Sequence, residues 1–209
     1  SYCWQEVVNM AVDLSKAICG KGNTQNSNLA WMIILGTIPA GVIGLLTKHI
    51  VETTLRSEVV IAITTITFAL LLGLAYWIAQ QKRDEYSINW KETLIIGLAQ
   101  AIALIPGTSR SGITTTAGLF TGLTPQAAAR YSFLLAIPVI ASAGILQGLE
   151  LMHSQVIIPW KELLLAIILS AISGYACIYL FLKLLRKIGF YPFVVYRIVL
   201  GLLLLLFIV

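Results

Sequence analysis

Charged residues are scarce in this sequence. Asp, Glu, Lys and Arg make up 11% of its 209 residues, whereas they make up about 25% of an ordinary soluble domain. Hydrophobic residues account for 58%, and the mean hydropathy is +0.90. This composition excludes an ordinary soluble fold and indicates a chain that buries apolar surface against lipid as well as against itself.

Cysteine is also sparse, and its placement excludes several kinds of site. Cys3, Cys19 and Cys177 form no C-x-x-C pair and have no histidine at metal-ligand spacing. This argues against a disulfide framework, a zinc site or a redox pair, and we expect plain structural thiols. An initiator Met and a signal-peptide pattern are lacking at the start, so we expect a sequence trimmed at its N-terminus.

Long apolar runs predict an all-α integral membrane protein. Residues 1–28 are polar and mixed, and residues 29–209 read as a single polytopic membrane domain. Thr124 and Pro125 are a good N-cap and first residue for the helix that enters the third span. Five runs are long enough to cross roughly 30 Å of hydrocarbon: 29–47, 59–79, 131–149, 163–182 and 193–209.

Residues 93–123 follow a different pattern. A short apolar run is broken by the sequence Pro-Gly-Thr-Ser-Arg-Ser-Gly at 106–112, and a second short run rich in Thr and Gly follows. Neither half reaches a full span. Irregular backbone at membrane depth is tolerated only where it lines a protein or water-filled cavity, so we predict a re-entrant helix-loop-helix hairpin.

The distribution of basic residues gives an orientation. The formal net charge is +5, but the basic residues stand in short loops between apolar runs, which indicates membrane topology rather than a nucleic-acid partner. With a re-entrant hairpin, one side collects nine basic residues and the other three (Lys48, Arg56 and Lys161). The richer side, with residues 1–28, should be cytoplasmic; it carries Lys16, Lys21, Lys82, Arg83, Lys91, Arg130, Lys183, Arg186 and Lys187.

The tip of the hairpin has the residues of an oxyanion site. Gly107 and Gly112 allow close backbone turns, the helix that follows offers its positive N-terminus, and Arg110 provides a planar fork for phosphate oxygens. Hydroxyl groups surround them, at Ser109, Ser111, Thr114, Thr115 and Thr116. The alternative is a packing hairpin whose hydroxyls bond to the helix backbone and whose arginine snorkels. An ionisable group at membrane depth favours the functional interpretation.

This region resembles the second signature of the undecaprenyl-pyrophosphate phosphatases, also called the bacitracin-resistance proteins. The likeness rests on Gln-x-x-Ala-Leu-x-Pro-Gly-x-Ser-Arg-Ser-Gly-x-Thr at 100–114 and continues through 132–138 and 192–197. The resemblance implies hydrolysis of undecaprenyl pyrophosphate to undecaprenyl phosphate, recycling the carrier lipid for peptidoglycan and giving bacitracin resistance. It also implies an inverted-repeat fold, of which this chain supplies one hairpin.

Roles follow by position in the signature. Arg110 would bind the diphosphate, Ser109 and Thr114 would hold its oxygens, and the further phosphate-binding positions would be Gly107, Ser111, Gly112 and Gln100. A divalent cation, Mg²⁺ or Ca²⁺, would assist. The enzyme would lie in the bacterial inner membrane with its site open to the outer face. The expected partners are the lipid bilayer and undecaprenyl pyrophosphate, with a homodimer left open and no nucleic acid.

The family's first, acidic signature has no counterpart in this sequence, so the metal ligands stay unknown. We expect it to precede Ser1, and we expect this chain alone to be inactive. A lipid-carrier transporter or flippase without hydrolysis is an alternative, because transport needs only binding and two access states. A non-catalytic scaffold would leave the polar tip unexplained.

Several other ionisable residues receive no catalytic role. A solvated loop position is expected for the two histidines and for four glutamates: His49, His153, Glu52, Glu58, Glu85 and Glu92. Glu150 reads as a solvated end of the third span. Arg197, inside the last apolar run, is open between reaching the cavity and snorkelling to the headgroups.

Overall fold

Helices make up the fold. The computed structural model describes residues 4–20, 22–53, 57–79, 82–153 and 160–208, and within these ranges no strand occurs. The all-α prediction is confirmed. The α-helices are α1 (Trp4–Ile18), α2 (Gln25–Thr53), α3 (Glu58–Ile78), α4 (Trp90–Ile102), α5 (Arg110–Phe120), α6 (Pro125–His153), α7 (Trp160–Ile188) and α8 (Tyr191–Ile208), with a 3₁₀ turn, η1 (Glu85–Ser87), before α4.

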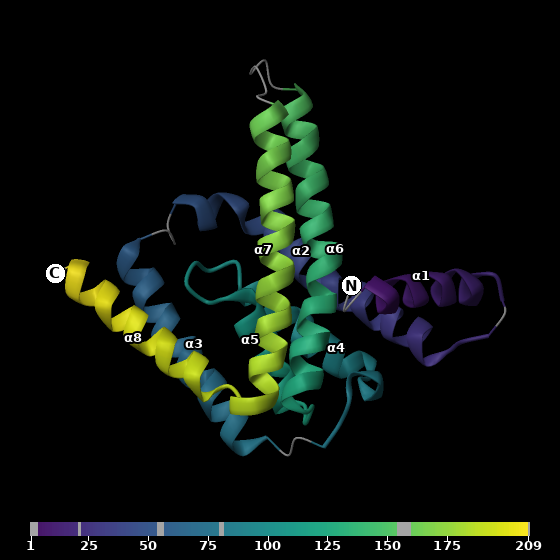
Figure 1. Cartoon of the computed structure of the whole chain (residues 1–209), viewed down its shortest axis with the longest axis horizontal. Coiled ribbons are helices and arrows are strands. Elements are labelled where there is room, and N and C mark those ends of the chain that lie inside the picture. Colours follow the sequence, from purple (N-terminus) through teal and green to yellow (C-terminus); the bar gives the residue numbers. More distant parts are fainter. Residues whose placement is uncertain (1–3, 21, 54–56, 80–81, 154–159, 209) are drawn as a thin grey trace.

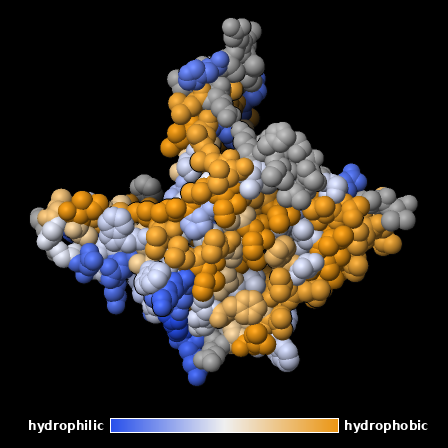
Figure 2. All heavy atoms as spheres, turned by 180° about the vertical axis from the view of Figure 1, so that it is seen from behind, coloured by the Kyte–Doolittle hydropathy of each residue, from blue (hydrophilic) through white to orange (hydrophobic). Residues whose placement is uncertain are grey.

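Five of these helices contain the five predicted spans. Four are long and apolar enough to cross a bilayer, namely α2, α3, α6 and α7. The apolar stretch of α8, Tyr191–Phe207, is shorter and at about 17 residues lies at the lower limit for a span. Figure 2 shows a mostly apolar face, with hydrophilic side chains gathered towards its lower left and near the top, where α6 and α7 project from the rest of the molecule. This is a multi-pass membrane protein.

The α4–α5 pair forms the predicted helix-loop-helix. α4 has 13 residues and α5 has 11, or about 20 and 17 Å at roughly 1.5 Å per residue, too short for a span of about 30 Å. The segments before α4 and after α5 meet at the end of the hairpin away from its loop: Arg83 N donates to Gly122 O (3.2 Å) and Thr124 N donates to Arg83 O (2.8 Å). The chain therefore returns to where it started.

The loop that joins α4 to α5 lies level with the middle of the α6–α7 pair (Figure 1). Its position within a bilayer stays a prediction. The N-terminus of α6 is the predicted one, because Pro125 is its first residue and Thr124 Oγ1 accepts a hydrogen bond from Ala127 N (3.2 Å).

Small residues bring the helices around the hairpin close together. A Cβ on Gly97 of α4 would lie 2.5 Å from the carbonyl oxygen of Gly36 on α2. A Cβ on Gly118 of α5 would lie 3.1 Å from that of Ala128 on α6. Contacts of this kind let helix backbones approach in membrane proteins. The hairpin is thereby held between α2, α6 and α3, and α3 in turn packs along α8.

Ion pairs stabilise the end of the hairpin away from its loop. Arg130 of α6 pairs with Glu6 of α1 and with the buried Glu85 (2.9 Å). Arg83 donates to both carboxylate oxygens of Glu92, at 2.5 and 3.0 Å. The expectation of solvated loop positions is therefore wrong for Glu85 and Glu92. Both carboxylates are needed to hold separate segments together.

Glu92 also completes the N-terminal cap of α4. Its carboxylate accepts from Asn89 N (3.0 Å), while the Asn89 side chain accepts from Glu92 N (3.1 Å), the reciprocal pattern of a capping box. Partial burial acts to raise the pKa of Glu92, but hydrogen bonds from Arg83 and the Asn89 backbone outweigh it and lower the pKa below its ordinary value.

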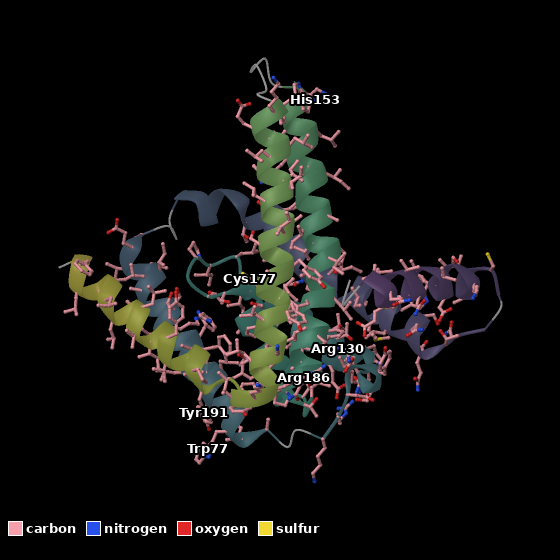
Figure 3. All side chains as sticks on the ribbon, viewed as in Figure 1. Trp77, Arg130, His153, Cys177, Arg186 and Tyr191 are labelled. Atoms are coloured by element: carbon pink, nitrogen blue, oxygen red, sulfur yellow. The ribbon has the colours of Figure 1, made fainter. Side chains whose placement is uncertain are left out.

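Polar and aromatic side chains mark one end of the molecule. Figure 3 shows Arg130 and Arg186 at the same end of the α6–α7 pair, and His153 at the opposite end. Trp77 and Tyr191 lie at the same end as the arginines and are 75% and 50% exposed. Aromatic and basic residues gather in this way at a membrane interface. The predicted orientation assigns Arg130 and Arg186 to the same side of the membrane, and the structure places them at the same end of the molecule.

Candidate functional site

A tight turn seats the loop on α3. After α4, Leu104 N, Ile105 N and Thr108 N each donate to the carbonyl three residues earlier, and a proline at 106 cannot continue the helix. Gly107 has φ +86°, and a Cβ there would lie 2.3 Å from Thr64 Oγ1 and 2.4 Å from Ile61 O. Only glycine fits at this position.

Side chains of α3 bind the loop carbonyls from one side. Thr64 Oγ1 donates to Pro106 O (2.7 Å), and Thr65 Oγ1 donates to Gly107 O (3.2 Å). Threonines within an apolar span usually bond to their own helix, and Thr64 also does so through Val60 O (2.7 Å). Thr64 and Thr65 therefore anchor the loop to α3.

Arg197 of α8 binds the same carbonyls. Its Nη2 donates to Gly107 O (2.8 Å) and Thr108 O (2.9 Å). The structure thus decides between the two roles left open for Arg197: it reaches the loop and does not snorkel. The sequence signal is its position inside an apolar run, where an arginine needs internal partners.

The N-terminus of α5 is open. Ser109 caps it by accepting from Gly112 N (3.3 Å), and does so with φ +66°, a backbone conformation that costs a non-glycine residue about 1–3 kcal/mol and concentrates at functional sites. Within the described part of the chain, the N–H groups of Arg110 and Ser111 donate to no backbone carbonyl. Free N–H groups at a helix N-terminus form an anion site.

Arg110 adds a charge to this helix end. Its side chain is half-buried, and its Nη1 is buried without a hydrogen-bond partner among the residues described. A buried guanidinium without a counter-charge is costly unless a ligand supplies one. The geometry therefore fits an anion in contact with Arg110 and the first turn of α5.

A cavity of about 220 Å³ borders the loop. Its polar wall includes Ser109, Ser111, Ser132 and Arg197, and its apolar wall consists largely of aromatic rings from α6, α7 and α8. Arg110 is not part of the wall. Of the two arginines near the loop, Arg197 therefore lines the cavity and Arg110 does not.

Two predicted site residues lie elsewhere. Thr114 is buried, donates to Arg110 O (2.9 Å) and pairs with Ser132 Oγ (2.7 Å). It positions Ser132, which the sequence argument did not single out although it begins the second matched stretch. Gln100 is buried with neither side-chain amide atom bonded to a described residue, and it does not line the cavity. Direct contact of these two residues with phosphate stays a prediction.

The remaining expectations concern residues away from the loop. Glu58 and His153 are exposed, and neither lies in the cavity wall. Cys19 and Cys177 are free and exposed. The side chains of His49, Glu52 and Glu150, together with Cys3, lie outside the described residues.

The residues around the loop are poor ligands for the expected divalent cation. Among the described residues, no three His, Cys, Asp or Glu side chains lie together, and the groups that border the loop are Arg110 of α5, Arg197 of α8 and several hydroxyls. This set does not fit Mg²⁺ or Ca²⁺, which prefer carboxylate and carbonyl oxygens. We therefore derive no step through a metal at these residues.

Comparison with known proteins places the chain. A family model described as bacitracin resistance protein BacA matches residues 1–203. The chain belongs to this family. It is 53% identical to the undecaprenyl-diphosphatase of Hahella chejuensis and 51% identical to undecaprenyl-diphosphatase 1 of Pseudoalteromonas translucida, in each case over 96% of this chain and 75% of the relative. A BacA relative from Nitrosococcus oceani, also named undecaprenyl-diphosphatase, is 47% identical over 98% of this chain and 77% of its own length.

Proposed function

We propose that this BacA family member hydrolyses undecaprenyl pyrophosphate to undecaprenyl phosphate and phosphate. Relatives that carry the name undecaprenyl-diphosphatase are about half identical to it over nearly its whole length. The observation that carries the proposal is Nη1 of Arg110, which is buried without a hydrogen-bond partner among the described residues, beside the open N-terminus of α5. Both groups would hold the oxygens of a phosphate.

The chemistry assigned to these residues is charge stabilisation. The oxygen of water forms a bond to the terminal phosphorus while the anhydride P–O bond breaks, and the electron pair of that bond stays on the lipid phosphate. The water proton passes to solvent. Arg110 and the N–H groups of α5 stabilise the charge that spreads over the transferring phosphoryl oxygens. No described residue of the cavity wall carries a carboxylate or an imidazole, so these residues contribute charge stabilisation and not general-base catalysis.

A requirement for Mg²⁺ or Ca²⁺ stays a prediction. The two arginines beside the loop disfavour binding of a cation at the loop itself. Chelation followed by addition of each cation tests it. Phosphate release that is the same with chelator as with either cation would rule the requirement out.

Orientation and location form a second part of the proposal. We infer a bacterial inner-membrane protein whose arginine-rich end faces the cytoplasm and whose loop opens to the outer face. Support comes from the nine-to-three bias of basic residues and from the common end of Arg130 and Arg186 (Figure 3). Single cysteines at Lys161 and Lys187 should be labelled from opposite sides of sealed vesicles. Labelling from the same side would overturn the topology.

The decisive experiment measures phosphate release from undecaprenyl pyrophosphate in detergent, with the protein expressed as its gene encodes it. We expect Arg110→Ala to lower the rate roughly 100-fold or more, as removal of a group that stabilises transition-state charge does. Arg186→Ala, on α7 and outside the cavity wall, is the matched control and should keep the wild-type rate. Unchanged activity in Arg110→Ala would reject the assigned site.

The same samples test the transporter alternative, and mass photometry of them tests for a homodimer. A protein that binds undecaprenyl pyrophosphate but releases no phosphate, with or without a divalent cation, would indicate a lipid carrier without hydrolysis.

A further inference from the structure

Arg197 has hydrogen-bonding capacity that the loop does not use. Its Nη2 is occupied by the carbonyls of Gly107 and Thr108, but its Nη1 is buried and has no partner in the described part of the chain. A Cβ on Gly112 would lie 2.7 Å from this Nη1, and both residues line the cavity. A charged donor therefore borders the cavity, and no described residue accepts a hydrogen bond from it.

Hydroxyl groups stand beside this donor. Ser109 and Ser111 are exposed and line the cavity. Ser132 lines it too, and its Oγ lies 3.4 Å from Ser111 O and 2.7 Å from Thr114 Oγ1. The hydroxyl of Ser132 already donates within this cluster, so the guanidinium of Arg197 and the hydroxyls of Ser109 and Ser111 form the donor set that matches the oxygens of a phosphate.

Aromatic rings form another part of the cavity wall. The ring of Phe181 on α7 lies 5.7 Å from Phe133 of α6, 4.8 Å from Phe193 of α8 and 6.3 Å from Phe190, which lies between α7 and α8, measured between ring centroids. Phe193 is four residues before Arg197 on the same helix, so the two share a face. Ser132 and Phe133 are adjacent on α6. Polar and aromatic groups thus meet around one space.

We propose that this cavity is a subsite for a prenyl phosphate, in which Arg197 binds the phosphate attached to the lipid and the ring cluster binds the start of the apolar chain. The assignment rests on the proposed hydrolysis: Arg110, outside the cavity wall, binds the terminal phosphate that leaves. The cavity of about 220 Å³ is below the roughly 300–1,000 Å³ of sites that enclose a drug-sized ligand. Only the phosphate and the first part of the chain fit, and the rest of a long chain lies in the bilayer.

The experiment measures direct binding of farnesyl phosphate, a short prenyl monophosphate, to the detergent-solubilised protein by calorimetry. Farnesol and inorganic phosphate are compared, because each carries only one half of the ligand. We expect farnesyl phosphate to bind more tightly than either. Arg197→Lys should weaken it roughly tenfold or more, because a charge-assisted bond in a fixed fork geometry is lost.

A second variant separates the two walls. Phe193→Ala should weaken farnesyl phosphate roughly tenfold through lost apolar contact and leave inorganic phosphate unchanged. Arg186→Lys and the exposed Phe207→Ala are matched controls that should leave farnesyl phosphate binding unchanged. Thr65→Val removes the hydrogen bond to Gly107 O, and Thr65 does not line the cavity. This variant therefore measures how much a loosened loop alone weakens farnesyl phosphate binding.

Three results would overturn the proposal: farnesol binding as tightly as farnesyl phosphate, Thr65→Val weakening binding as much as Arg197→Lys, or Phe193→Ala leaving it unchanged. If Arg197→Lys does not fold, the Phe193→Ala result decides. Because binding is measured without turnover, its outcome is independent of phosphate release. Tight farnesyl phosphate binding in a protein that releases no phosphate would reject the hydrolysis and keep the subsite.

Discussion

Glycines behave differently in two regions of this molecule. Around the hairpin, a Cβ on Gly97, Gly107 or Gly112 would approach a neighbouring atom to less than 3 Å. On the projecting helices α6 and α7, a Cβ on Gly144, Gly148 or Gly174 would meet no described atom within 4 Å. Helix α4 of the hairpin is about as apolar as α6 and α7. Apolarity therefore identifies a membrane helix, but small residues in contact identify the faces that pack against protein.

The burial of the two regions agrees with this distinction. In α5, seven consecutive residues from Ile113 to Leu119 are buried, whereas the described part of α7 buries only Leu182 and Leu185. Figure 1 shows α7 beside the upper part of α6, extending beyond the other helices. The packed region is where the loop carbonyls, the open helix end and the cavity occur. The predictions below test whether sensitivity to substitution follows the same division.

The largest effect is expected at the turn. Gly107→Ala places a methyl group against Thr64 and Ile61 and forces a side chain into a left-handed conformation, so the loop must move. We expect loss of phosphate release and a lower melting temperature in detergent. Gly148→Ala, in open space on α6, should keep activity. Equal activity of both variants would remove the distinction between the two regions.

The second largest effect is expected at the ion pairs that lie at the end of the hairpin away from its loop. Arg130→Ala leaves the buried carboxylate of Glu85 without its partner. Breaking a buried pair costs about 3–5 kcal/mol, and because Arg130 is about one third exposed, we expect about 1–3 kcal/mol in thermal unfolding. Lys183→Ala, on α7, should have little effect. A stable Arg130→Ala protein would show that these charges do not hold α1 and η1 to α6.

The smallest effect is a dependence on pH. The pKa of Glu92 is lowered in the folded protein, so its stabilisation is present above the ordinary value of about 4.3 and is lost as the pH falls through the folded pKa. Melting temperature should drop on acidification below about pH 4. Glu92→Gln should reduce this drop, and an identical acid profile in that variant would exclude Glu92 as its source.

The sequence was sufficient for features that depend on local patterns. The five apolar runs, the break at Pro106 and Gly107 and the cap at Thr124 follow from span length and turn chemistry, and the structure confirms the helices and the cap. The placement of Ser109 and Ser111 at the cavity could also be expected, because they flank the turn.

Features that depend on packing between distant segments could not be predicted. The contact of Arg197 with the loop exists because α8 packs along α3, and no periodicity in one helix encodes that pairing. From the sequence, Glu85 is expected to be a solvated loop residue, and only the packing of α6 places Arg130 beside it. Thr114 carries the hydroxyl expected of a phosphate ligand, but the rotation of α5 turns it towards Ser132.

The central claim is that the substrate phosphate binds at the α4–α5 loop, and protection from labelling tests it most directly. Ser111→Cys would be made in a protein that keeps Cys177, exposed on α7 and outside the cavity wall, as its only other cysteine. The account predicts that undecaprenyl pyrophosphate slows thiol labelling at 111 and leaves the rate at Cys177 unchanged. Equal labelling at 111 with and without the lipid would contradict it.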